Sequence, residues 1–155
     1  KELQYLLDNN LREKGEFQLT NALENMKAKG VKFSPGKVTE WLDCGNKDAT
    51  VYTNQRILEF IKNTPLVSKT VVNTNSTIIA PCFIGENVKL INSTVGPHVS
   101  IGDGTIIENA TIKNSIIQTN SVIKDAQLSN SMIGNAAYFT GKSSDVSLSD
   151  YSTIK

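Results

Sequence analysis

Apolar residues in the first 62 positions recur mainly at the spacing of three to four residues that amphipathic helices show. The spacing predicts a helix over 1–14, which Gly15 would end, and a second over 17–26, before Gly30. A third stretch of helical spacing covers 47–61. Three helices are therefore expected in this part of the chain.

The segment between the second and third helices has a different pattern. Residues 31–33 alternate like a short strand, and 34–37 (Ser-Pro-Gly-Lys) has turn chemistry. Residues 38–44 read as a second strand, closed by Gly45. We therefore predict a small α/β piece over 1–62, too thin to bury its own apolar residues fully.

Beyond this piece, large aliphatic residues return every 16 to 18 positions. Three such series are interleaved: Val72, Leu90, Ile107, Ile123 and Phe139; Ile78, Val95, Ile112 and Leu128; Ile84, Ile101, Ile117 and Ile133. Series of mostly small residues lie between them: Ser76, Ser93, Ala110 and Ala126; Cys82, Val99, Ser115 and Ser131; Val88, Thr105, Ser121 and Ala137. Such self-similarity is the signature of a repeat architecture.

A hexad that occurs three times per coil predicts three short parallel strands per coil, and hence a triangular solenoid. Large residues would fill the faces, and small ones would fit near the corners. We expect about four coils over 67–139 and a cap over 140–155 that protects the open end. Asn75, Asn92 and Asn109 recur every 17 residues and are predicted to hydrogen-bond along one corner.

Charge is distributed unevenly and supports a division into two modules. Of the first 62 residues 19 are charged, against 12 of the remaining 93. Pro65 cannot continue a helix that ends before it. The predicted domains are therefore 1–62 and 63–155.

Overall composition narrows the function classes. The net charge of +1 argues against a basic nucleic-acid surface or a polybasic membrane patch. No apolar run approaches the roughly 18 residues that a membrane span needs. Two cysteines, Cys44 and Cys82, form neither a disulfide framework nor a CxxC metal motif. We expect a cytoplasmic protein with no nucleic-acid or membrane partner.

The repeat resembles a known family. Ile84–Val88 (IGENV) and Ile101–Thr105 (IGDGT) look like the hexapeptide repeat of left-handed parallel β-helices. The resemblance, and not the spacing, implies the left hand.

The first module resembles the end of the catalytic domain of sugar-phosphate nucleotidyltransferases. Gly15–Leu23 (GEFQLTNAL) is similar to that family's GEYQLTDAL segment, with Phe for Tyr and Asn for Asp. Trp41–Gly45 (WLDCG) matches its W-x-D-x-G strand end, and Asn54–Leu58 lies where the family's next helix is expected. The expected fold class is mixed: a left-handed, triangular β-helix preceded by a small α/β piece of this catalytic domain.

The resemblance implies a reaction between a nucleoside triphosphate and a sugar-1-phosphate that yields a nucleotide-sugar and pyrophosphate. Two polyanions must meet, so magnesium is the implied cofactor. Asp43 stands at the matching metal-ligand position, and Glu16 and Trp41 are candidates for the border of the sugar pocket. The alternatives are that Asp43 caps the helix that follows, and that Glu16 and Trp41 serve packing or capping.

The sequence also departs from the complete family pattern. It contains no glycine-rich phosphate-binding loop, and Gly102–Gly104 reads as a solenoid corner. We therefore expect a C-terminal portion of a longer enzyme, inactive by itself, whose β-helix serves assembly of a homo-oligomer or regulation. The sequence does not specify the nucleotide or the sugar.

Two other functions share the β-helix fold. Hexapeptide-repeat acyltransferases use a histidine base, and His98 is the only histidine here. Its place at a corner before Val99 predicts a ring that points to solvent. The second alternative is a purely structural oligomerisation module.

Overall fold

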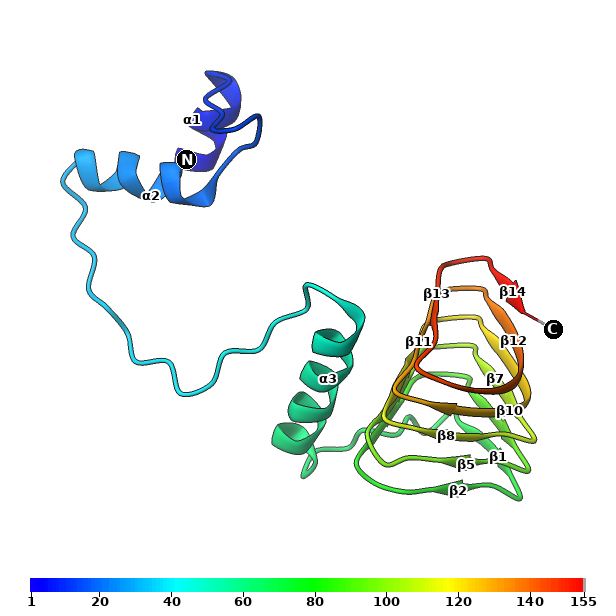
Figure 1. Cartoon of the computed structure of the whole chain (residues 1–155). Coiled ribbons are helices and arrows are strands. Elements are labelled where there is room, and N and C mark those ends of the chain that lie inside the picture. The colour runs from blue at the N-terminus through cyan, green and yellow to red at the C-terminus, as the bar shows by residue number, and fades with distance from the viewer. Residues whose placement is uncertain (155) are drawn as a thin grey trace. The chain divides into compact units, whose positions relative to one another are not determined.

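The computed structural model describes residues 1–154, apart from the side chains at 143 and 144. The chain forms two compact units (Figure 1), which divide between Trp41 and Leu42. Helix α3 belongs to the second unit, with the solenoid, because it packs against it. The boundary expected between residues 62 and 63 stays a prediction.

The first unit is a pair of helices, α1 (Glu2–Asp8) and α2 (Leu19–Ala28). Leu6 and Ala22 are buried, and Glu2 accepts hydrogen bonds from Asn25 and from Lys29. Both helices confirm the predicted spacing, but α1 ends six residues before the expected position 14. Asn10 has a left-handed backbone conformation with φ of 50°, which ends the helix there.

The expected strand pair at 31–33 and 38–44 is wrong. These residues have no strand hydrogen bonding within the described chain. A strand needs a neighbour for its backbone groups, and an isolated two-stranded hairpin is only marginally stable in water. Alternating side chains therefore could not produce a sheet here by themselves.

Helix α3 (Lys47–Ile61) has the predicted bounds. Its N-cap is Asn46, whose side chain accepts a hydrogen bond from the amide of Ala49 at 2.9 Å. Val51 and Leu58 are buried, and between them Asn54 accepts a hydrogen bond from Ser100 Oγ at 2.6 Å. One stripe of the helix therefore faces the solenoid, where it contacts strands β6 (Val99–Ile101) and β9 (Ser115–Ile117).

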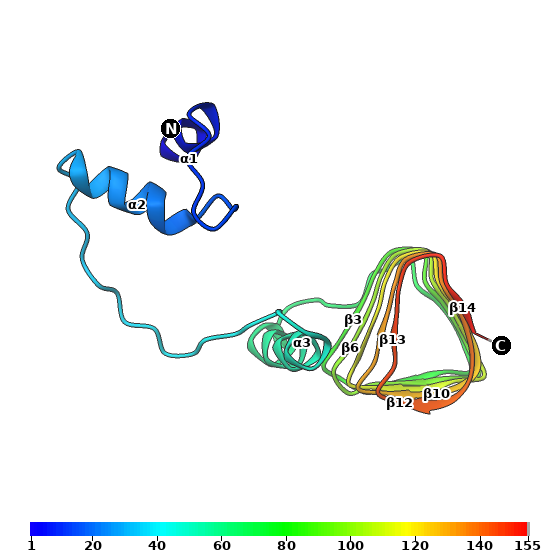
Figure 2. The same cartoon turned by 45° about the horizontal axis from the view of Figure 1, so that its top comes forward.

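The solenoid has about five turns and a triangular cross-section (Figure 2). One face stacks β1 (Val72–Thr74), β4 (Lys89–Ile91), β7 (Ile106–Glu108), the starts of β10 (Val122–Ser129) and β12 (Tyr138–Ser144), and β14 (Thr153–Ile154). The second stacks β2 (Thr77–Ile78), β5 (Thr94–Val95), β8 (Thr111–Lys113) and the ends of β10 and β12. The third stacks β3 (Cys82–Ile84), β6 (Val99–Ile101), β9 (Ser115–Ile117), β11 (Met132–Ile133) and β13 (Ser147–Leu148). All pairings between these strands are parallel, as predicted.

The core consists of the predicted series of large and small residues. The large side chains of these series from Ile84 to Phe139 are at most 2% exposed. The two earlier members differ: Ile78 is only partly buried, and Val72 is 53% exposed because it lies beside Lys89, while Asn73 is the partner of Leu90. The series assigns Val72 to the inward position that Asn73 occupies in the structure. A shift of one residue moves a side chain to the other face of a strand.

The solenoid continues beyond the expected four coils, and the described residues 140–154 extend it where a cap over 140–155 was predicted. Residue 155 lies outside the described residues. β13 pairs with β11, and β14 pairs with β12. Leu148 is only partly buried and Ile154 is 40% exposed, because no coil among the described residues covers them. The apolar pattern therefore fades at the end of the solenoid although the backbone ladder persists.

The predicted asparagine ladder is present at one corner. Asn75 donates to Asn92 at 3.0 Å, Asn92 to Asn109 at 3.4 Å, and Asn109 to the carboxylate of Asp125 at 3.0 Å. All four have positive φ, which asparagine and aspartate tolerate better than most residues. Another corner requires Gly96, since a Cβ there would lie 2.0 Å from the carbonyl oxygen of Ile79.

Candidate functional site

The Trp41–Gly45 motif ends in a tight turn built around the carboxylate of Asp43. Its Oδ1 accepts hydrogen bonds from the amides of Cys44 at 2.8 Å and Gly45 at 3.2 Å. None of the described residues donates to Oδ2. A Cβ at Gly45 would lie 3.1 Å from Oδ2, so glycine keeps this oxygen accessible.

Two threonines of α3 hold the turn against the helix. Thr53 Oγ1 donates to the carbonyl of Asp43 at 2.6 Å, and Thr50 Oγ1 donates to that of Cys44 at 3.2 Å. The N-cap is Asn46, so Asp43 does not cap α3. The structure therefore removes the capping interpretation of Asp43.

The Asp43 carboxylate fits one ligand position of a magnesium ion. Mg²⁺ usually takes one or two carboxylates, and waters and substrate phosphates complete its octahedron. An exposed carboxylate with one uncommitted oxygen suits that role. Within residues 1–154 no group of three acidic, cysteine or histidine side chains could hold a metal ion, so Asp43 would need phosphate oxygens or further ligands.

Glu16 and Trp41, the other two predicted site residues, belong to the first unit, and Asp43 belongs to the second. Glu16 is exposed, accepts a hydrogen bond from Gln18 at 3.3 Å and closes a small turn with Glu13. Trp41 is 83% exposed. Both side chains are thus exposed among the described residues, and their place at a sugar pocket stays a prediction.

His98 differs from its predicted surroundings. Its ring does not point freely to solvent, because Nε2 lies 2.7 Å from Glu59 Oε1 of α3 and the side chain is only 18% exposed. This hydrogen bond and one from Lys62 hold the pKa of Glu59 below its usual range. The histidine thus joins the end of α3 to a solenoid corner.

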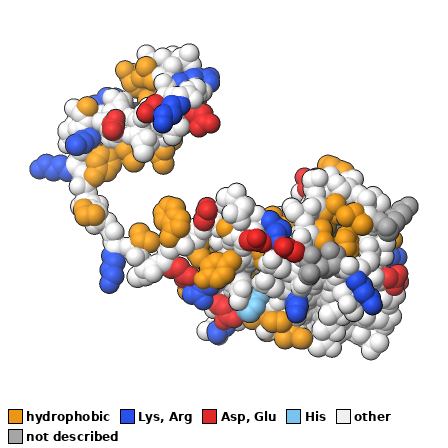
Figure 3. All heavy atoms as spheres, viewed as in Figure 1, with side chains coloured by type: hydrophobic (Ala, Val, Ile, Leu, Met, Phe, Trp, Pro, Cys, Tyr) orange, Lys and Arg blue, Asp and Glu red, His pale blue; other side chains and the backbone are white. Residues whose placement is uncertain are grey.

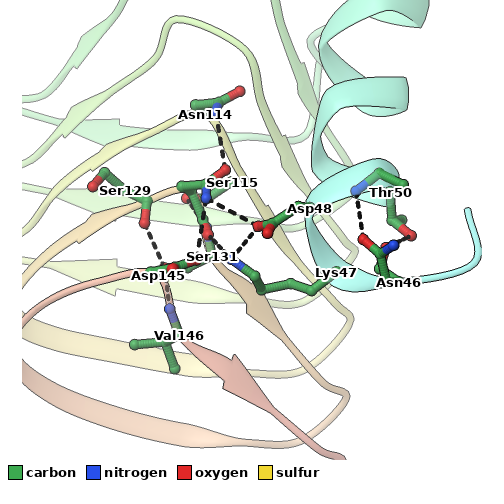
Figure 4. Close-up of polar contacts among 12 residues, drawn as sticks. Asn46, Lys47, Asp48, Thr50, Asn114, Ser115, Ser129, Ser131, Asp145 and Val146 are labelled. Carbon is green, nitrogen blue, oxygen red and sulfur yellow. Dashed lines mark hydrogen bonds and ion pairs between the residues drawn. The ribbon is translucent and has the colours of Figure 1, made fainter.

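A polar cluster at the start of α3, which the sequence did not predict, joins Lys47, Asp48 and Asp145 (Figure 4). Asn130 completes it through hydrogen bonds to both aspartates. We call it the Lys47 cluster. Lys47 Nζ pairs with Asp48 at 2.6 Å and with Asp145, and it donates to the carbonyl of Asn130 at 3.0 Å. The only local signal was a lysine and an aspartate directly after the N-cap, since the partners lie over 80 residues away.

The exposed surface of α3 and of the first unit carries apolar side chains (Figure 3). Tyr52 and Phe60 of α3 are 54% and 58% exposed, and Leu19 of α2 is 62% exposed. Among the described residues, no helix has the length and apolar character that crossing a membrane requires.

These features define a class of protein to which the chain is similar. A parallel solenoid, a helix docked on it and the WLDCG turn before that helix resemble the C-terminal region of sugar-1-phosphate nucleotidyltransferases. Two curated relatives carry this likeness, both named glucose-1-phosphate thymidylyltransferase. The chain is 26% identical over 143 residues to that of Streptomyces antibioticus and 23% identical over 143 residues to that of Streptomyces griseus.

The matches cover most of this chain but less than half of each relative. Each covers 82% of this chain and 40% of the relative, so the chain spans about two fifths of the length of both. A match of that extent includes part of residues 1–62 as well as the solenoid. No family model matches the chain. The likeness therefore confirms the resemblance to nucleotidyltransferases, as a distant one.

Proposed function

We propose that the chain is the C-terminal portion of a sugar-1-phosphate nucleotidyltransferase. In this reaction an oxygen of the sugar-1-phosphate attacks the α-phosphorus of a nucleoside triphosphate. The bond from the α-phosphorus to the bridging oxygen breaks, and pyrophosphate leaves with that electron pair. The products are a nucleotide-sugar and pyrophosphate. Both substrates are cytoplasmic metabolites, so the proposal places the protein in the cytoplasm.

The observation that carries the proposal is the match to two thymidylyltransferases over both modules. The turn at Asp43 supports it independently, because an accessible carboxylate is held in place there by two backbone amides. A magnesium ion held by Asp43 would neutralise and align the two phosphate groups. Glu16 and Trp41 would border the sugar.

No observation favours the acyltransferase alternative. A histidine base needs a ring nitrogen that can reach its substrate. In this chain Nε2 of His98 is engaged by Glu59 and lies beneath α3. The solenoid is better explained as a platform for α3 and, in our proposal, for assembly into a homo-oligomer.

The test measures pyrophosphate release from glucose-1-phosphate and each common nucleoside triphosphate, with magnesium. The whole protein, of which this chain would be the C-terminal portion, should release pyrophosphate with at least one nucleotide. The 155-residue chain by itself should give no release above a blank, because it lacks a glycine-rich phosphate-binding loop. Absence of release from the whole protein with every nucleotide would refute the proposal.

A further inference from the structure

The Lys47 cluster joins the first turn of α3 to two successive corners of the solenoid. Asn130 follows β10 and Asp145 follows β12, one coil further on. Asn130 Nδ2 donates to Asp48 at 3.2 Å and to Asp145 at 3.1 Å. Asn114, at the corner one coil earlier, donates to Asn130 Oδ1 at 3.4 Å. The cluster therefore extends an amide ladder of the solenoid onto the helix.

Lys47 is the cation on which this cluster depends. Its side chain is only 18% exposed, and it lies between two carboxylates that share the amide of Asn130. If the charge of Lys47 were removed, Asp48 and Asp145 would face each other as like charges. The cluster would then open, and the first turn of α3 would lose its attachment to the solenoid.

The same first turns of α3 hold the Asp43 turn. Thr53 Oγ1 donates to the carbonyl of Asp43 at 2.6 Å, and Thr50 Oγ1 bonds the carbonyl of Cys44. Thr50 and Thr53 lie three and six residues after Lys47. The contact with the solenoid at Lys47 and the contacts with the Asp43 turn at Thr50 and Thr53 are therefore made by the same short segment of α3.

We infer that the solenoid positions the Asp43 carboxylate: the Lys47 cluster fixes the start of α3, and Thr53 ties the Asp43 turn to that helix. Lys47 and Thr53 are thus positioning residues, and neither has to touch a substrate. The solenoid acts on the reaction site through α3, in addition to any part in assembly. The value of this coupling for catalysis rests on the proposed role of Asp43, whereas the coupling itself does not.

The first experiment follows amide hydrogen exchange in the 155-residue chain, at Cys44 and Gly45. Thr53→Val removes the hydroxyl but keeps the shape, and it should speed exchange at both amides about fivefold, the factor that one net hydrogen bond typically contributes. Thr53→Ser keeps the hydroxyl and should restore slow exchange. Thr64→Val is the matched control, since Thr64 makes a similar bond to Ile61 beyond the other end of α3.

A second pair of variants tests the solenoid end of the coupling. Lys47→Met should speed exchange at Cys44 and Gly45, while the ladder amide of Ile116, which bonds Ser131 at 2.9 Å, stays protected. Lys62→Met is its control, because Lys62 pairs with Glu59 at the other end of α3. Unchanged exchange in Thr53→Val and Lys47→Met would overturn the inference, and so would failure of Thr53→Ser to restore it.

The third measurement uses the whole protein and connects the coupling with the reaction. Thr53→Val and Lys47→Met should raise the magnesium concentration that gives half-maximal rate, and Thr53→Ser should return it to the original value. An unchanged magnesium requirement, together with faster exchange, would show that the coupling does not serve the metal site. If Asp43→Asn is also fully active, the proposed metal role of Asp43 fails while the coupling stands. If the whole protein releases no pyrophosphate with any nucleotide, the proposed function fails, and the exchange measurements still decide the coupling.

Discussion

Asp43 and Asn46, three residues apart, have separate tasks in one turn. Asn46 supplies the N-cap of α3, which leaves the Asp43 carboxylate free of that role. Asp43 instead accepts two amide bonds through Oδ1 and keeps Oδ2 accessible. A substitution that keeps Oδ1 as an acceptor can therefore remove the charge of Asp43 without breaking the turn.

We predict that Asp43→Asn in the whole protein lowers turnover on the order of 100-fold or more, the typical loss of a direct electrostatic contact. The amide keeps an oxygen for Cys44 and Gly45, so thermal stability should hardly change. High magnesium or manganese should recover part of the rate. Rate measured against metal concentration gives the answer.

The control for this variant is Asp8→Asn, which removes an exposed carboxylate from α1 that accepts a hydrogen bond from Gln4. It should leave the rate unchanged. Near-normal turnover of Asp43→Asn would remove Asp43 from the metal site.

Glu59 provides a pH test at the same scale. Its pKa is lowered by the hydrogen bond from His98 and by Lys62. Because the pKa of Glu59 is lower in the folded chain than in the unfolded chain, ionised Glu59 stabilises the folded state at pH values above the unfolded pKa, near 4.5. This stabilisation is lost as the pH falls through the pKa of the folded chain. The wild-type chain should therefore have a higher melting temperature than Glu59→Gln at pH 6, and the difference between the two melting temperatures should vanish at low pH.

Glu86→Gln is the matched control, because Glu86 is exposed in the same unit and its side chain has no partner among the described residues. Its melting temperature should follow the wild type at every pH. A difference between wild type and Glu59→Gln that grows as pH falls would contradict the assignment.

At the scale of elements, the solenoid gains its order from repetition. Each coil offers the same inward positions, so neighbouring coils stabilise one another. Ile117 lies at the centre of one such series and is 1% exposed. Its parallel neighbours are Ile101 and Ile133.

Ile117→Asp should unfold the coils around it, since a carboxylate there would be buried without a partner. Thr111→Asp places the same charge on the outer side of β8 and should be tolerated. Circular dichroism during heating distinguishes them. A soluble Ile117→Asp chain of unchanged stability would be incompatible with the observed core.

The elements also show what a sequence can predict. The series of Ile84 and Ile101 and the bounds of α3 followed from periodicity, because each coil or turn repeats one local rule. The strands expected at 31–33 and 38–44 failed, since a strand depends on a distant partner. The WLDCG motif indicated Asp43, whereas the Lys47 cluster escaped notice because Asn130 and Asp145 are remote in sequence.

At the scale of the whole molecule, the proposed assembly needs an apolar surface, and one face of the solenoid carries an apolar row on its outer side. Ile106, Val122 and Tyr138 are register partners on the outer side of β7, β10 and β12, and all three are half-buried. An apolar row of this kind is suited to contact with a second copy of the chain.

We therefore expect light scattering to give a mass of at least twice the 16.9 kDa of one chain. Ile106→Lys should lower the mass toward that of the monomer, because it places a charge in the apolar row. Thr111→Lys, on the neighbouring face, should leave it unchanged. A monomer at all protein concentrations would contradict assembly through this face.

The length of helix α3 also limits the number of coils that can lie between its contacts with the solenoid. It meets His98 near its end and Asp145 at its start, and the path between these corners crosses three coil spacings, or about 14 Å at 4.7–4.8 Å each. Repeat proteins usually gain or lose whole repeats without harm to the ladder. Here, removal of one coil between His98 and Asp145 would keep every strand paired but shorten the platform by nearly 5 Å, close to one helical turn. The helix could then not keep both its contact with His98 and its contact with Asp145. We therefore expect the number of coils beneath α3 to be fixed and the number after Asp145 to be free to vary.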